Sequence, residues 1–148
     1  MSLKERLNDD IKAAMRAKEK TRVGLLRMLQ SAIRNAEIEQ GRELSETEHY
    51  AVVNKLIKQR RDSVEQYRQG GRDDLADKEA AEAEILTEYL PPALSDAEID
   101  DAVDQAITEA EASGPQDMGK VMGVLKERLQ GRADMGEVSQ RVKDRLAS

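Results

Sequence analysis

The chain has 148 residues, of which 36% are charged and 2% are aromatic, and its formal net charge is −6. The lack of cysteine excludes disulfides, zinc ribbons, iron–sulfur clusters and thiol chemistry, and with one histidine we expect no metal and no cofactor. No apolar run reaches the roughly 18 residues of a membrane span. The first ten residues resemble neither a signal nor a transit peptide, so we expect a cytoplasmic protein with no membrane partner.

Helical periodicity runs through the first 90 residues. Apolar residues recur every three or four positions over 3–18, 21–40, 46–69 and 74–89. The first of these stretches is carried by Leu3, Leu7, Ile11 and Met15. Gly41 and the pair Gly70–Gly71 stop the second and third stretches. We therefore predict about four helices in this part of the chain.

Two consecutive prolines, Pro91 and Pro92, interrupt the helical pattern, because proline cannot continue a helix. Three shorter periodic stretches follow at 96–112, 117–129 and 135–146. The sequence thus predicts an all-α protein: an N-terminal helical domain at 1–90, a hinge at 91–94, and a small C-terminal three-helix bundle at 95–148.

Three capping boxes mark predicted helix starts. In each Ser-x-x-Glu unit the serine oxygen accepts from a free backbone amide, while the glutamate reaches back to the serine amide. The pairs are Ser2 with Glu5, Ser45 with Glu48, and Ser95 with Glu98. Three such boxes, each followed by helical periodicity, favour helix over disorder.

Charge is distributed unevenly along the chain. Residues 1–72 carry 16 basic and 11 acidic residues, whereas residues 73–117 carry 15 acidic residues and a single basic one, Lys78. Residues 118–148 are again net basic. Two interpretations stay open. Either the basic ends fold against the acidic middle and neutralise it, or they face a polyanion such as RNA.

Basic residues are most concentrated in the segment from Lys12 to Arg34. This segment contains seven basic residues and one acid, Glu19. Arg27 and Arg34 are seven residues apart on the predicted polar face, and Lys20 continues their line if the helix starts early enough. This stripe is a candidate for tracking phosphates. The alternative is an ordinary solvated helix face.

An ion pair is expected between the third and fourth helices. Arg60 falls within the apolar stripe of its helix, and Glu79 and Glu82 fall within the stripe of the next. Because an unpaired buried charge is costly, Arg60 should meet Glu82 or Glu79. The alternative uses the two glutamates as an acid/base pair. The single histidine, His49, is expected to be exposed, and no catalytic residue can be named.

The most specific pattern is the run from Asp117 to Asp134, followed by Met135-Gly136-Glu137-Val138 and a final helix. This run resembles the GatB/YqeY family. Three upstream segments resemble the stand-alone YqeY-like branch: Leu26-Arg27-Met28-Leu29, Lys58-Gln59-Arg60-Arg61 and Glu88-Tyr89-Leu90-Pro91. The resemblance covers nearly the whole chain.

The resemblance implies an N-terminal helical domain and a three-helix domain similar to the tail of the B subunit of the tRNA-dependent amidotransferase. That tail contacts the tRNA body and does not carry the chemistry, so an association with tRNA is implied. Carbon–nitrogen ligase activity with glutamine as amido-N-donor accompanies the family, although no residue here can be assigned to it. The implied RNA-facing cations are Lys120, Lys126, Arg128, Arg132, Arg141, Lys143 and Arg145.

Three functions follow from these observations. The leading one is a non-catalytic accessory protein that binds tRNA or another structured RNA. The second is an interaction module that docks on a larger amidotransferase or synthetase. The third is an enzyme, such as a small amidase or transferase subunit. The oligomeric state stays open.

Overall fold

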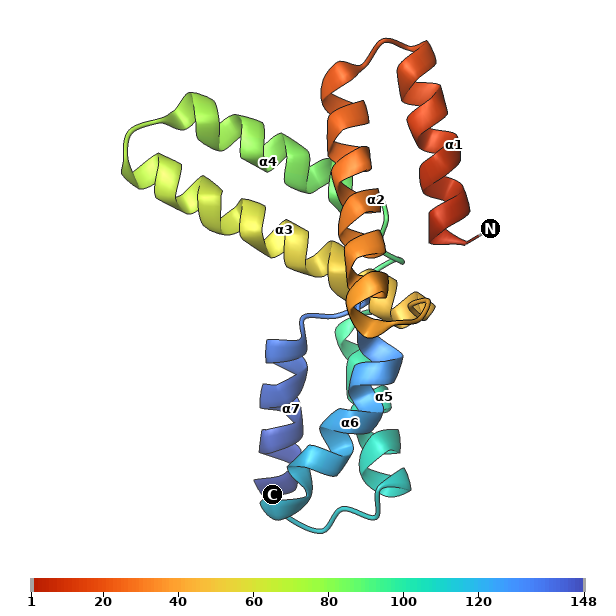
Figure 1. Cartoon of the computed structure of the whole chain (residues 1–148). Helices are drawn as coiled ribbons and strands as arrows, with labels where there is room; N and C mark the ends of the chain where they lie inside the picture. The colour runs from red at the N-terminus through yellow and green to blue at the C-terminus, as the bar shows by residue number, and fades with distance from the viewer. Residues whose placement is uncertain (1, 148) are drawn as a thin grey trace. The chain divides into compact units, whose positions relative to one another are not determined.

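The computed structural model describes residues 2–147 and is built from helices joined by short connections (Figure 1). The described part of the chain contains seven α-helices and no strand, which confirms the all-α prediction. The helices are α1 (Leu3–Arg16), α2 (Lys20–Gln40), α3 (Glu46–Gln69), α4 (Asp73–Thr87), α5 (Asp96–Glu109), α6 (Met118–Leu129) and α7 (Met135–Ala147), with a 3-10 turn at Pro115–Asp117 before α6. No helix within residues 2–147 is long and apolar enough to cross a lipid bilayer.

The chain divides into two compact units, one ending at Leu90 and the other beginning at Pro91. In the first unit, α1 packs along α2 and α3 packs along α4, as two antiparallel hairpins (Figure 1). In the second unit, α5, α6 and α7 pack on one another.

Each unit has its own hydrophobic core. The core of the first unit contains Leu7, Leu26, Leu29, Leu86 and the ring of Tyr89, among others. The core of the second unit is aliphatic and is built from Ile99, Val103, Ala106, Val121, Leu125, Leu129, Val138, Val142 and Leu146. Burial of these apolar faces supplies the main driving force for folding in both units.

Serine caps are present at α1, α3 and α5, and the full reciprocal capping box forms at α3 and α5, whereas at α1 Ser2 Oγ accepts from the Glu5 amide. Ser45 Oγ accepts from the Glu48 amide, and Glu48 Oε1 accepts from the Ser45 amide. The same reciprocal pair forms between Ser95 and Glu98. Arg42 also donates two hydrogen bonds to the Glu48 carboxylate, and these hydrogen bonds lower the pKa of Glu48 to about 2.

Two expectations about individual side chains are wrong. Met15 is 52% exposed, and Ala14 occupies its place in the core. Each i+4 step rotates around the helix by about 40°, so a run of four such residues drifts off the buried side. His49 is 7% exposed rather than solvated, because it lies one and two turns before the buried residues Val53 and Ile57. Burial lowers the pKa of His49.

Candidate nucleic-acid interface

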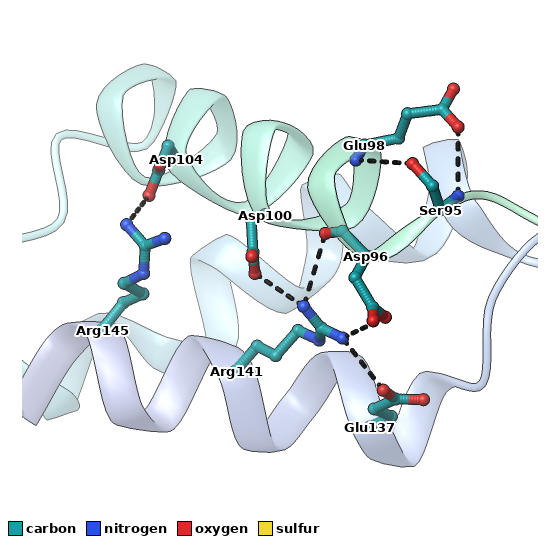
Figure 2. A network of polar contacts seen from close by, with 8 residues as sticks. All are labelled: Ser95, Asp96, Glu98, Asp100, Asp104, Glu137, Arg141 and Arg145. Atoms are coloured by element: carbon teal, nitrogen blue, oxygen red, sulfur yellow. Dashed lines mark hydrogen bonds and ion pairs between the residues drawn. The ribbon is translucent and has the colours of Figure 1, made fainter.

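The arginines of α7 contact the acidic helix α5 (Figure 2). Arg141 donates to Asp100 Oδ1 and to Asp96 Oδ1, each at 2.7 Å, and to Glu137 Oε1 at 3.0 Å. One turn further on, Arg145 pairs with Asp104. The three aspartates are spaced four residues apart, which places them along one side of α5 opposite the two arginines.

Arg141, which makes most of these contacts, is partly shielded from solvent. The Arg141 side chain is 21% exposed. The hydrogen bonds that Arg141 donates to Glu137 and Asp100 raise the pKa of its guanidinium above the usual value, so its charge is fixed. A third arginine, Arg128 of α6, pairs with Glu109 of α5. Arg128, Arg141 and Arg145 therefore hold α6 and α7 against α5, as the charge-neutralising interpretation expects.

The other candidate cations of the C-terminal unit are exposed. Lys120 and Lys126 lie on α6, Lys143 lies on α7, and Arg132 lies in the connection between these helices. The backbone carbonyl of Arg132 accepts from the amide of Leu94 at 2.9 Å, which fixes the connection while the side chain faces solvent. What distinguishes the three arginines above is their ion pairs with α5, since Arg128 and Arg145 are exposed as well.

A second basic surface lies on α2. Because α2 begins at Lys20, the residues Lys20, Arg27 and Arg34 follow one another at seven-residue intervals. They line one face of the helix together with Gly24 and Ser31, and all five are exposed. We call these five residues the α2 face. At 1.5 Å per residue, its three cations span roughly 21 Å.

The α2 face carries no acid, since α2 has no Asp or Glu before Glu37. Arg22, on another side of α2, is by contrast paired with Glu19 and Glu88. Arg27 Nη2 lies 3.6 Å from the sulfur of Met15. A Cβ built at Gly24 would have open space around it, so the backbone is accessible between Lys20 and Arg27. The α2 face is thus a line of solvated cations beside bare backbone.

Arg60 and Glu82 lie together between α3 and α4. Arg60 Nε is 3.3 Å from Glu82 Oε2, and both side chains are 15% exposed. Arg60 Nε makes no aligned hydrogen bond, so this contact is an ion pair, while Nη2 donates to the sulfur of Met28 at 3.1 Å. Glu79 is half-buried on α4. Among residues 2–147, no group of three or more acids or histidines could hold a metal ion.

Sequence reasoning missed two polar features of the N-terminal unit. The Tyr89 hydroxyl donates to Asp10 Oδ2 at 2.6 Å, and the guanidinium of Arg6 lies 4.6 Å from the centre of the Tyr89 ring. A polar cleft of about 190 Å³ also lies between α1 and α2 and is lined by Lys4, Leu7, Asn8, Gln30, Ile33, Arg34 and Glu37. These contacts join residues too far apart in sequence to leave a local signal.

Comparison with known proteins decides the family. A family model described as Yqey-like protein matches residues 4–146 of the chain. The chain belongs to the Yqey-like protein family. The resemblance to the YqeY branch inferred from the sequence is thereby confirmed.

Relatives in the Yqey-like family are fungal proteins named altered inheritance of mitochondria protein 41, mitochondrial. The one from Lachancea thermotolerans is 42% identical over 112 residues, which cover 74% of this chain and 60% of the relative. The one from Pyrenophora tritici-repentis is 33% identical over 142 residues, covering 94% of this chain and 78% of the relative. A Saccharomyces cerevisiae relative is 32% identical over 138 residues, covering 89% and 68%. The chain thus spans less than two thirds of the Lachancea relative.

The relatives' names contradict the cytoplasmic location expected from the sequence. All three of these Yqey-like relatives are named mitochondrial. The expectation was wrong because it used the composition of the first ten residues alone. The absence of a leader pattern in one segment does not define a compartment.

Proposed function

We propose that the protein is a non-catalytic accessory protein that binds tRNA or another structured RNA. The observation that supports this proposal most is the α2 face, whose cations Lys20, Arg27 and Arg34 are exposed and which itself contains no acid. Glu37, one turn beyond Arg34, is paired with Lys4. Cations placed in this way attract phosphates even when the net charge of the chain is negative, since the field near the surface is set by local charge. The resemblance of the C-terminal sequence to the amidotransferase tail supports the same function.

The RNA contacts are divided between the two units. In the C-terminal unit, Lys120, Lys126, Arg132 and Lys143 are the RNA-facing cations, while Arg128, Arg141 and Arg145 shape the unit by binding α5. Recognition is mostly by phosphate and shape, because few aromatics are available for stacking on splayed bases. The logarithm of the affinity should therefore fall linearly with the logarithm of salt concentration.

The test compares charge reversal on and off the α2 face. Arg27→Glu together with Arg34→Glu should weaken binding of the full chain to bulk tRNA at least tenfold at low salt and flatten the salt slope. Lys55→Glu with Lys58→Glu makes the same charge change at exposed positions of α3 and serves as the control. Equal losses in both variants, or no tRNA binding by the parent protein, would contradict the proposal.

Docking on a larger amidotransferase or synthetase is the competing outcome of that experiment. A protein partner that stays bound through nuclease treatment and high salt, with no tRNA affinity in the chain alone, would favour docking. Carbon–nitrogen ligase activity is not part of the proposal. Glu82, one of the two acids considered for catalysis, is held by Arg60.

A further inference from the structure

The cleft between α1 and α2 adjoins the α2 face, since Arg34 belongs to both. The two helices lie side by side in the N-terminal unit (Figure 1), with the buried side chains of Leu7 and Ile33 beneath the cleft. A cavity of about 150 Å³ takes one benzene ring. At about 190 Å³, this cleft has room for a single planar base.

Two amides in the cleft are bonded head to tail. Gln30 Nε2 donates to Asn8 Oδ1 at 2.8 Å. This bond leaves the Asn8 amide group as a donor and the Gln30 carbonyl as an acceptor. Unpaired bases carry adjacent donors and acceptors on their edges, and a single asparagine or glutamine amide can pair with adenine through both its groups. In this cleft the free donor and the free acceptor come from two neighbouring amides instead.

The charged groups of the cleft are not equivalent. Lys4 Nζ is bound to Glu37 Oε1 at 2.7 Å, and Glu37 Oε2 accepts from the Leu44 amide at 2.9 Å, so these two charges satisfy each other. Arg34 is exposed at the edge of the cleft. A guanidinium there can bind a phosphate or stack on a base plane.

We propose that this cleft binds one unpaired nucleobase, with Asn8 and Gln30 on the base edge and Arg34 on the adjoining phosphate. The proposal rests on the proposed function and deepens it, because it makes part of the RNA affinity depend on unpaired bases. A free nucleoside presents the same edge chemistry, so the experiment separates the two sources.

The test uses the full chain labelled with nitrogen-15. Adenosine, single-stranded oligoadenylate and a fully paired RNA duplex are titrated separately, and the side-chain amide signals of Asn8 and Gln30 are followed. Oligoadenylate should shift both signals, and the duplex should shift neither. If free adenosine also shifts both signals, the site is open to free nucleosides. A shift with oligoadenylate alone shows that the base must be part of an RNA strand.

Affinities of variants provide the second measurement. Asn8→Leu and Gln30→Leu should each weaken oligoadenylate binding about fivefold or more while leaving duplex binding unchanged. Asn35→Leu is the control, because Asn35 is an exposed amide of α2 outside the cleft. Gln30 is half-buried, so its variant is accepted only if its backbone spectrum is native. Asn8 is exposed, so Asn8→Leu should leave the fold intact and tests the proposal even if the Gln30 variant does not fold.

The possible failures are distinguishable. If Arg27→Glu with Arg34→Glu abolishes RNA binding while the two amide signals stay still and both leucine variants bind normally, the cleft proposal is overturned and the proposed function stands. If no RNA binds, the proposed function fails, and the adenosine titration then tests the cleft proposal by itself. Shifts of both amides then support a nucleoside site, and unmoved amides overturn it.

Discussion

The two units of the protein place their polar contacts differently. The N-terminal unit holds polar groups inside or beside its core: the Arg60–Glu82 pair, the Tyr89–Asp10 hydrogen bond and the side chain of His49. The C-terminal unit has a purely aliphatic core, with its ion pairs along the edge of α5. The same chain therefore neutralises charge in two ways.

This difference predicts which changes should alter the stability of each unit. A charge that loses its partner away from water keeps the full desolvation cost, whereas an exposed pair is screened by salt and contributes less. The N-terminal unit should accordingly be sensitive to partner removal and to pH, and the C-terminal unit to ionic strength. The three tyrosines, Tyr50, Tyr67 and Tyr89, all lie in the N-terminal unit, so tyrosine fluorescence follows that unit alone.

The largest effect is expected from Arg60→Met. The variant leaves Glu82 without its partner at 15% exposure, which should lower the free energy of unfolding of the N-terminal unit by about 3 kcal/mol. Urea unfolding followed by tyrosine fluorescence measures this change. Adding Glu82→Leu should recover most of the loss, and Arg61→Met at an exposed neighbour should cost little. If the single and double variants were equally unstable, the pair would not be the cause.

Tyr89→Phe should have the next largest effect. It removes the hydrogen bond to Asp10 and should cost about 1–2 kcal/mol at neutral pH. Burial and this hydrogen bond raise the pKa of Tyr89 above its ordinary value of 10.0. The parent protein should therefore lose stability as the pH rises above 10, because only the unfolded tyrosine ionises there. Unfolding curves from pH 9 to 11 check this, read by circular dichroism, and an unchanged pH slope in the variant would rule it out.

Arg141→Met should destabilise the C-terminal unit by less than Arg60→Met destabilises the N-terminal unit. It breaks contacts with Asp96, Asp100 and Glu137, which are all more exposed than Glu82. The difference between parent and variant should shrink in 1 M salt, where the screening length falls to about 3 Å. Hydrogen exchange of α5 and α7 amides at low and high salt provides the measurement. A salt-independent difference would mean that packing, and not charge, was lost.

The smallest effect concerns His49. Because burial lowers its pKa, the folded state holds the neutral ring. The resulting stabilisation is present above pH 6.5 and is lost as the pH falls through the folded pKa, since the unfolded histidine takes up a proton first. Tyrosine-monitored melts at pH 7.5 and 5.5 should show a loss in the parent that is reduced in His49→Leu. Equal losses would assign the pH effect to other groups.

Local patterns predicted much of the fold. The helices follow from apolar spacing, and the caps at Ser45 and Ser95 form as their sequences indicate, because both signals depend on residues a few positions apart. The assignment of Met15 to the core failed where a fixed spacing drifted off the buried face. The assignment of His49 to the surface failed because His49 lies one and two turns before Val53 and Ile57, on the buried side of the helix.

The sequence by itself determined the helical class, the stop at Pro91–Pro92 and the family to which the chain belongs. It also located the basic and acidic segments, since charge is a property of composition. Only the tertiary structure decided which cations are paired with acidic side chains. Arg141 contacts Asp100, 41 residues away in the chain, while Arg27 and Arg34 stay exposed on α2. Pairing between distant side chains depends on how helices pack, and a one-dimensional pattern does not contain that geometry.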